Sequence, residues 1–252
     1  MAKKDRTDRQ AVIDSIRNKQ KSADKRRGFA IVGVCVTIAL LIVAAAAYQP
    51  IKDWYDLRTF DSQSLDEIGA AADDCREITT KKATGEQQHV EPGTPIAYED
   101  APPAFGEHYN VWDTIDRKLY KTTDRPDVGE LVHNPEHGYT ILWYDKTVAD
   151  NDAMMDDLRG IASKFDDNAN YRNKFKAVPW TSEDGEAFPG KQHVAMTHWS
   201  VNGEGATPAE KQVGVFQYCS APSGEAPGGV HGEVPLHRLP RARRDLIRDR
   251  LT

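Results

Sequence analysis

The chain has 252 residues and a formal net charge of −6, and this charge is unevenly divided. Residues 1–27 carry ten Lys and Arg against four Asp, whereas the rest of the chain carries 23 Lys and Arg against 35 Asp and Glu. The length fits one full domain with appendages. The acidic main part argues against nucleic acid as a partner, and a basic arm beside an acidic domain is typical of a protein held at a membrane.

Residues 29–48, FAIVGVCVTIALLIVAAAAY, predict a transmembrane helix because twenty uncharged residues span about 30 Å, the thickness of a bilayer core. The basic residues before this run place the N-terminus in the cytoplasm. We expect a cytoplasmic arm at 1–28 that contacts anionic lipid heads, a helix at 29–48 in the lipid bilayer, and a juxtamembrane linker or helix at 49–73. A cleaved signal peptide is disfavoured because the apolar run is too long and the arm too extended.

Three cysteines are present, and Cys35 lies in the apolar run. Cys75 and Cys219 lie in the part that we expect outside the cell, where disulfides persist. Their pairing would close a loop of about 145 residues and stabilise the fold by about 4–5 kcal/mol in the chain-entropy model. The alternative is a reactive thiol or a metal-ligand pair, but neither cysteine has a CxxC partner.

The residues that follow the apolar run predict mostly short elements. Residues 50–60 are amphipathic and either extend the membrane helix or lie on the surface. Ser64 with Glu67 three residues later is a capping-box pattern, so we expect a short helix over 64–75. We also expect a polar loop at 79–88, a short strand within 90–98, and a loop stiffened by proline and glycine at 101–109.

The second half of the chain predicts a sheet. Residues 140–144 lack polar alternation and predict a strand that is covered on both faces. Apolar residues at helical spacing predict a helix over 150–165, capped by Asp150 or Asp152. Further strands are expected at 174–178, 193–201 and 212–219. This order predicts an α+β (or α/β) compact sandwich of about 4–6 strands with one or two helices, over residues 74–225.

The segment LVHNPEHGYTILWY at residues 131–144 places His133 and His137 around an Asn-Pro-Glu sequence. Proline disfavours the helical conformation at the residue before it, so we expect a turn rather than a helix. The segment resembles the metalloprotease HExxH motif only superficially, since there the Glu follows the first His and all residues are helical. A turn here would still direct both imidazoles toward one point.

A metal site lined by histidines is the sharpest chemical hypothesis. Three or four imidazole nitrogens suit Zn(II) or Cu(II), and a carboxylate can join them or orient an imidazole. Two alternatives stay open, in which the histidines satisfy backbone groups or form an acid–base catalytic site. His198, on the strand expected at 193–201, is interpreted as a satisfied core histidine. The expected metal donors are His108, His133, His137, His89 and Glu136.

Residues 226–252 form a tail rich in Arg and Pro, unlike the body of the domain. Codons exist for residues 230–240 that, shifted by one base, encode FMEKYPYTDSP, which looks like the end of an amphipathic helix and a polar stop. Two interpretations are therefore open. The tail is either the product of a shifted reading frame or a native basic helix that binds an acidic partner.

Several motifs together resemble a known family. The segments APPAFGEHY, LVHNPEHGYTILWY and HVAMTHWS, in this order behind one apolar helix, resemble an actinobacterial membrane-anchored family, domain of unknown function 3105. Its marks are a PPxxGxHY loop and an HNxEHG segment, and the resemblance covers about residues 74–225, including DDCREIT and QVGVFQYCSAPSGEA. Pro135 stands where leucine is common in the family. The resemblance implies membrane anchoring and a histidine-lined site, and it implies no activity.

We therefore expect a single-pass plasma-membrane protein with a cytoplasmic N-terminus and an extracytoplasmic domain. The domain is expected to bind copper or zinc in metal handling or envelope assembly. One alternative is a non-catalytic interaction module of the cell envelope with structural histidines and an envelope protein partner. Another is a metal-dependent hydrolase or redox enzyme. The sequence has no GxSxG elbow, P-loop, CxxC or dinucleotide glycine pattern, so it identifies no catalytic residue.

Overall fold

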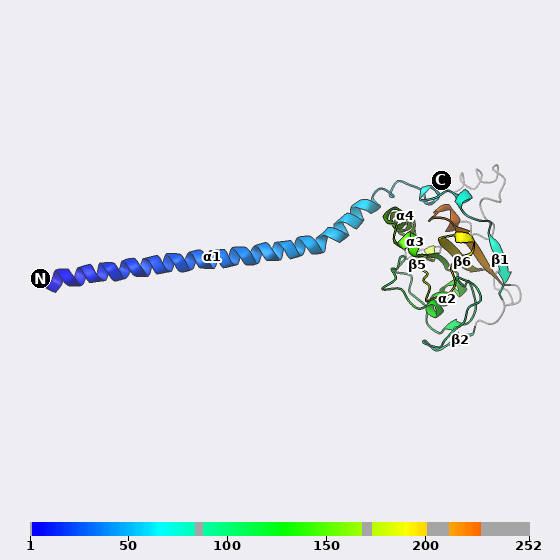
Figure 1. Cartoon of the computed structure of the whole chain (residues 1–252), viewed down its shortest axis with the longest axis horizontal. Helices are drawn as coiled ribbons and strands as arrows, with labels where there is room; N and C mark the ends of the chain where they lie inside the picture. The colour runs from blue at the N-terminus through cyan, green and yellow to red at the C-terminus, as the bar shows by residue number, and fades with distance from the viewer. Residues whose placement is uncertain (1, 84–87, 168–172, 201–211, 228–252) are drawn as a thin grey trace. The chain divides into compact units, whose positions relative to one another are not determined.

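The structure is a computed structural model that describes residues 2–83, 88–167, 173–200 and 212–227. The chain divides into two compact units, Met1–Tyr55 and Asp56–Thr252. Figure 1 shows the long helix α1 and the smaller elements of the second unit. The tail at 228–252, with its two interpretations, lies outside the described residues.

Helix α1 spans Ala2–Leu57 and contains Pro50. Within it, Ser15–Leu57 is long and apolar enough to cross a membrane by length and composition, as the run at 29–48 predicted. The apolar side chains of this run are exposed along the helix, which a bilayer would cover. Of the two alternatives for residues 50–60, the structure shows a continuation of the helix to Leu57.

A five-stranded sheet forms the centre of the second unit, in the order β1-β7-β6-β4-β5. Strands β4 and β5 are parallel, and the other neighbouring pairs are antiparallel. The parallel pair is joined through two helices, α3 and α4, as a crossover between parallel strands requires. The strands are β1 (Thr79–Lys82), β4 (Thr140–Tyr144), β5 (Phe175–Pro179), β6 (Val194–Ser200) and β7 (Val213–Cys219).

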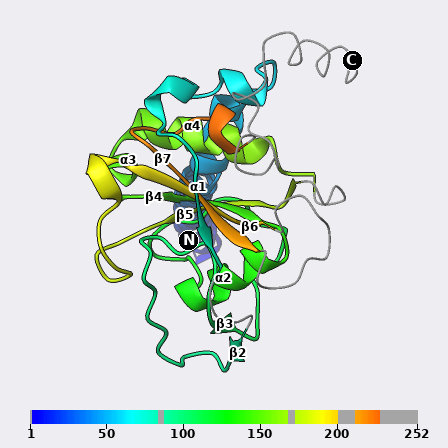
Figure 2. The ribbon, with the colours of Figure 1, turned by 90° about the vertical axis from the view of Figure 1, so that its right-hand side faces the viewer.

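Helices cover both faces of this sheet, as Figure 2 shows. On one face α3 (Lys146–Ala149) and α4 (Asp152–Ser163) pack on a core that includes Leu142 and Met196. On the other face, Leu131 of α2 (Val128–Glu136) packs with Ile141, Trp143 and Ala195. Alternate residues of β4 thus enter different cores, which explains why this strand has no polar alternation. The expected α+β architecture is confirmed.

Three local predictions were wrong. Residues 79–82 form the edge strand β1 rather than a loop, because backbone pairing to β7 orders a strand whose side chains are all exposed. The region 64–75 forms two short 3-10 helices, Leu65–Glu67 and Ala72–Asp74, because Gly69 adopts a positive φ of 78° between them. The cap of α4 is Asn151, whose side chain accepts a hydrogen bond from the Met154 N–H.

The predicted disulfide between Cys75 and Cys219 is present. It joins the segment before β1 to the end of β7, and neighbouring backbone bonds support it. The Arg76 N–H donates to the Tyr218 carbonyl, and the Ser220 N–H donates to the Asp74 carbonyl. The bond therefore closes the same sheet edge that β1 completes.

Candidate metal centre

Two short strands bring together histidines that lie nineteen positions apart in the sequence. Strand β2 (His89–Val90) pairs in parallel with β3 (His108–Tyr109), and the register places His89 opposite His108. Their ring centroids lie 4.6 Å apart. Residue pairs opposite one another in a sheet point to the same face, so this register alone directs both imidazoles to one side.

Helix α2 supplies the opposite wall of the site. His133 and Glu136 are three positions apart in this helix and therefore lie on one face of it. Gly129, one turn earlier, allows close approach, since a Cβ at this position would lie 2.9 Å from Cζ of Tyr109. Glycine at position 129 thus permits β3 to lie close enough to α2 for the two sets of side chains to meet.

The prediction of a turn at Asn-Pro-Glu was wrong, because α2 includes Pro135 and runs to Glu136. Proline before the last helical residue removes only one donor, and its effect on the preceding residue is a preference rather than a prohibition. Tertiary contacts outweigh that preference here. Leu131 is fully buried, and the buried Asn134 accepts from the Asp113 N–H and donates to the Asp113 carbonyl.

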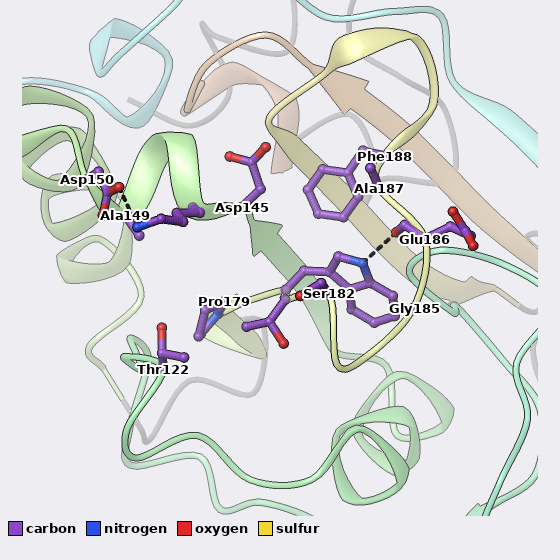
Figure 3. A pocket seen from close by; sticks show the side chains of 13 residues that line it. Thr122, Asp145, Ala149, Asp150, Pro179, Ser182, Gly185, Glu186, Ala187 and Phe188 are labelled. Atoms are coloured by element: carbon purple, nitrogen blue, oxygen red, sulfur yellow. Dashed lines mark hydrogen bonds and ion pairs between the residues drawn. The ribbon is translucent and has the colours of Figure 1, made fainter.

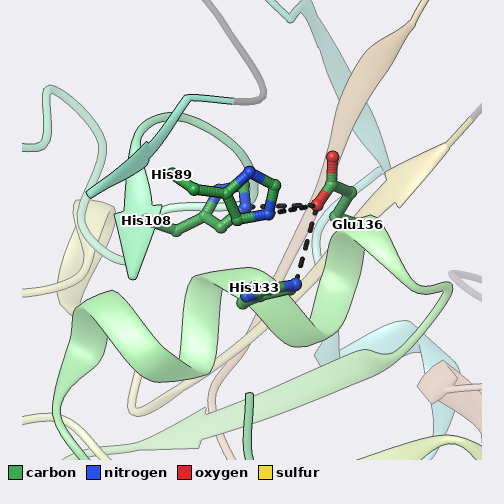
Figure 4. Close-up of side chains that lie close together, drawn as sticks. All are labelled: His89, His108, His133 and Glu136. Carbon is green, nitrogen blue, oxygen red and sulfur yellow. Dashed lines mark hydrogen bonds and ion pairs between the residues drawn. The ribbon is translucent and has the colours of Figure 1, made fainter. Parts of the chain in front are cut away.

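Four side chains converge between α2 and the β2–β3 pair. One donor atom from each of His89, His108, His133 and Glu136 lies within 4.8 Å of every other. Figure 4 shows the three imidazoles gathered around the carboxylate. Oε2 of Glu136 lies 3.1 Å from Nε2 of His108, 3.7 Å from Nε2 of His89 and 3.9 Å from Nε2 of His133.

Backbone carbonyls fix the orientation of the two buried imidazoles. Nδ1 of His108 lies 2.8 Å from the Gly106 carbonyl oxygen, and Nδ1 of His133 lies 2.7 Å from the Tyr109 carbonyl oxygen. A carbonyl only accepts, so each Nδ1 carries the proton and donates it. In the neutral ring Nε2 then has a lone pair and no proton. This is the arrangement in which a ring nitrogen serves as a metal ligand.

The neutral form of His108 is favoured by its surroundings. Its side chain is fully buried, and this desolvation lowers the pKa of His108, although the hydrogen bond to Gly106 and the charge of Glu136 oppose the shift. A neutral His108 places an Nε2 lone pair 3.1 Å from a carboxylate oxygen of Glu136. Two acceptors at this distance need a cation between them, which is either a proton or a metal ion.

His137 lies at the edge of this group rather than inside it. It follows the last residue of α2 and is exposed, and its Nε2 lies 2.9 Å from Nε2 of His133. Burial of part of the ring and the neighbouring His133 lower the pKa of His137. The indole of Trp112 covers both rings, with centroids 5.3 Å from His133 and 5.5 Å from His137.

The other histidines of the described part of the chain lie elsewhere. His198 is half-buried on β6, and its Nδ1 lies 3.0 Å from the Tyr139 carbonyl oxygen, so its ring is held by the backbone as expected. His193 pairs with Asp145 at 2.8 Å. Neither residue belongs to the four-donor group.

A separate cavity of about 470 Å³ lies at the carboxyl ends of β4 and β5 (Figure 3). Trp180 and Phe188 line it, and the indole Nε1 donates to the Glu186 carbonyl. Among its charged lining residues, Asp145 contacts His193 and Lys146 forms an ion pair with Asp150. None of the four convergent donors lines this cavity.

Sequence patterns did not reveal a buried ion pair beside the site. Lys176 of β5 has no exposed side-chain surface, and its Nζ donates to Asp113 at 2.5 Å and to the Thr114 carbonyl at 2.5 Å. The Arg117 carbonyl accepts its third hydrogen bond at 3.1 Å. The lysine inside the apolar run FKAVP is the sequence feature that could have indicated a buried, paired charge. The backbone of Asp113 also hydrogen-bonds to the Asn134 side chain, so Asp113 connects the ion pair to α2.

The comparisons identify a family without an activity. A family described as "Protein of unknown function (DUF3105)" matches residues 89–229, which is more than half of the chain. The matched region begins at His89 and includes all four convergent donors. No curated protein and no solved structure matches the chain.

Proposed function

Because the chain belongs to the family of proteins of unknown function DUF3105, the site itself has to supply the function, and we propose that it binds a transition metal ion. The proposed ion is Zn(II) or Cu(II). The proposed ligands are His89, His108, His133 and Glu136. The domain would then act in metal handling or envelope assembly rather than in turnover.

The main support for this proposal is that the group has more acceptor atoms than N–H groups to donate to them. His108 and His133 both direct a protonated Nδ1 at a carbonyl, so in the neutral rings both Nε2 atoms carry a lone pair, and that of His133 lies 2.9 Å from Nε2 of the exposed His137. One of these lone pairs points at the Glu136 carboxylate at 3.1 Å. Acceptors that converge without enough protons are costly to bury unless a cation joins them. A metal ion satisfies all four donors at once.

The spacing of the donors supports a single ion. Ligands about 2.0–2.1 Å from a tetrahedral metal lie about 3.3 Å from one another. The distances of 3.1, 3.7 and 3.9 Å from Oε2 of Glu136 to the three Nε2 atoms bracket this value. Other ligand atoms of the group lie up to 4.8 Å apart, so the histidine donors must also draw together when one ion binds. Three nitrogens and one oxygen suit Zn(II), and imidazole also suits Cu(II).

The proposed cellular location follows from the ends of α1. The basic residues before the apolar run favour a cytoplasmic N-terminus, which directs the second unit out of the cytoplasm. The Cys75–Cys219 disulfide supports this orientation because such bonds persist in oxidising compartments. We therefore propose a single-pass plasma-membrane protein whose metal centre faces the cell exterior. Anionic lipid heads bound by the arm at 1–28 belong to the same proposal.

Metal analysis of the purified full-length chain in detergent tests the function. The wild-type chain is expected to retain about one equivalent of Zn(II) or Cu(II), and His133→Ala is expected to lose it, with affinity reduced at least about 10–100-fold. His193→Ala is the matched control, because it removes a histidine bound to a carboxylate outside the group. Equal metal content in the wild-type chain and His133→Ala would refute the proposal.

A second function is favoured by one observation. The carbonyls of Gly106 and Tyr109 and the carboxylate of Glu136 already hold the buried histidines, so the group also serves to tie α2 to the β2–β3 pair. In that case the domain is a non-catalytic interaction module of the cell envelope. His133→Ala would then lower the thermal unfolding temperature equally in the presence and absence of a chelator. A stability loss that depends on added metal separates the two functions.

A further inference from the structure

His137 stands between the buried His133 and solvent, whereas His89 of the four-donor group is itself 43% exposed. His137 is exposed, whereas His133 is buried, and the two Nε2 atoms lie 2.9 Å apart. The rings are nearly parallel, with an interplanar angle of 21° and centroids 4.9 Å apart. The indole of Trp112 contacts both rings, with interplanar angles of 58° to His133 and 59° to His137.

In the metal-free protein, His137 forms a hydrogen bond with His133. Nδ1 of His133 donates to the Tyr109 carbonyl, so Nε2 of the neutral His133 ring is an acceptor. When both rings are neutral, the hydrogen between the two Nε2 atoms, which lie 2.9 Å apart, is therefore the N–H of His137. His137 thus occupies the lone pair of His133 that a metal ion requires. An ion can bind His133 only when this hydrogen bond is broken.

The same spacing also suits simultaneous ligation. Two ligands at 90° around an ion, each about 2.0–2.1 Å from it, lie about 2.9 Å apart, as in a tetragonal Cu(II) site. When the proton of His137 moves to its Nδ1, its Nε2 becomes a ligand at this distance from Nε2 of His133. His137 can then hold an ion together with His133 once both rings turn, so that their lone pairs converge on the ion instead of pointing along the line between the two Nε2 atoms.

From this geometry we propose that His137 and His133 form an outer exchange position for the metal ion. An arriving ion replaces the hydrogen bond between the two rings, is held by both Nε2 atoms, and then moves inward as His89, His108 and Glu136 replace His137. Release follows the reverse order. The inference rests on the proposed function, because it assigns the route by which the same buried site fills and empties.

Trp112 makes the outer position observable. It is 54% exposed and, with Val111, is one of two large apolar residues exposed in the described part of the second unit. Its contact with both imidazoles places it beside an ion at the outer position. A paramagnetic ion such as Co(II) quenches a nearby indole, whereas its visible absorption reports the complete ligand set. Trp199 lies 6.1 Å from His108, so an ion at the inner site also quenches, and the early quenching that depends on Trp112 is the part that reports arrival at the outer position.

The test is rapid mixing of the full-length chain in detergent with Co(II), followed by release into excess EDTA. In the wild-type chain, we expect quenching of Trp112 to precede the rise of visible absorption. His137→Ala is expected to slow loading and release alike, each by about tenfold, with less than a threefold change in Kd, because a transient ligand alters rates and not the final complex. His193→Ala is the matched control and should leave both rates unchanged.

Two further variants keep the test decisive. His137→Gln restores a donor to the lone pair of His133 but removes the nitrogen ligand, so it should remain as slow as His137→Ala. Trp112→Phe should abolish the early quenching and leave the absorption rates within about twofold of the wild-type values. These two results separate ligation by His137 from a general loosening of the helix end.

Different results would contradict the exchange position and the proposed metal site. Loading and release rates that are unchanged or faster in His137→Ala overturn the exchange position, and so does a tenfold rise in Kd with faster release, which would make His137 a permanent ligand. Each of these leaves the proposed function standing, because the wild-type chain still binds the ion. A wild-type chain that binds no Co(II), Zn(II) or Cu(II) overturns both.

Discussion

The second unit buries two polar clusters that differ in how well their protons match their acceptors. Lys176 has three N–H groups and three acceptors, which are the Asp113 carboxylate and the carbonyls of Thr114 and Arg117. Among the histidines, the acceptors outnumber the N–H groups that remain to donate to them. Nδ1 of His108 and Nδ1 of His133 donate their protons to backbone carbonyls. The Nε2 atoms of these two neutral rings are therefore acceptors, as is the Glu136 carboxylate.

The difference separates a structural cluster from a binding cluster. A closed network such as that of Lys176 needs nothing from outside and stabilises the fold only when it is complete. In the proposed function the histidine cluster is completed by a metal ion, and Asn134 of α2 links this cluster to Asp113 of the other. Burial alone therefore does not distinguish the two clusters, and the proposal of a metal site rests on the convergent acceptors of the histidine cluster.

The largest expected effect is at the closed cluster. Lys176→Met is expected to lower the free energy of unfolding by about 3–5 kcal/mol, because it leaves the Asp113 carboxylate without its cation. Urea denaturation followed by tryptophan fluorescence measures it. The matched control is Lys146→Met, which breaks an exposed pair with Asp150 and should cost under about 1 kcal/mol. Equal losses in the two variants would contradict the closed-network interpretation.

Substitution in the open cluster should show the opposite pattern. His108→Ala is expected to reduce metal affinity by about 100-fold, which corresponds to about 2.7 kcal/mol. Metal added to the wild-type chain should raise its unfolding temperature, because the ion binds only the folded state, and this increase should disappear in His108→Ala. Calorimetry with and without EDTA measures both. An increase that persists in His108→Ala would place the ion elsewhere.

The residue that links the clusters should affect both quantities by intermediate amounts. Asn134→Ala leaves the Asp113 N–H and carbonyl without their buried partners, and we expect a loss of about 1–3 kcal/mol in unfolding free energy. Metal affinity should fall less than in His108→Ala. Asn173→Ala, which removes an exposed amide bond to the Asp167 carbonyl, serves as the control and should change stability little. Identical unfolding curves for Asn134→Ala and the wild-type chain would break the proposed link.

The smallest effect is a dependence on pH in the metal-free chain. Desolvation lowers the pKa of His108, so between this folded pKa and the ordinary value of 6.5 the unfolded chain binds more protons than the folded chain. Stability therefore rises with pH in this interval and is lost as the pH falls below about 6.5. Urea denaturation with EDTA at pH 7.5 and 5.5 measures the slope, which His108→Gln should flatten. A slope that is unchanged in His108→Gln would assign the proton uptake to other groups.

Short-range patterns in the sequence determined much of the fold. The uncharged run at 29–48, the apolar strand at 140–144 and the helical spacing in 150–165 each express a preference of consecutive residues for one environment. The order of these elements predicted the sandwich, and Cys75 and Cys219 were predicted as partners. The histidines, glutamate and motif segments were also visible in the sequence, and they led to the hypothesis of a metal site.

Only the tertiary structure decided which of these residues meet. The register that places His89 opposite His108 pairs two strands of two residues each, which are too short for an alternating side-chain pattern to specify it. Strand β1 is ordered by pairing with β7, and α2 persists through Pro135 because its buried residues are held by contacts distant in the sequence. For the same reason, His137, which was predicted to be a metal donor, lies at the exposed edge of the group in the structure. Local preferences amount to a few tenths of a kcal/mol to about 1 kcal/mol per residue, and burial and long-range pairing together exceed them.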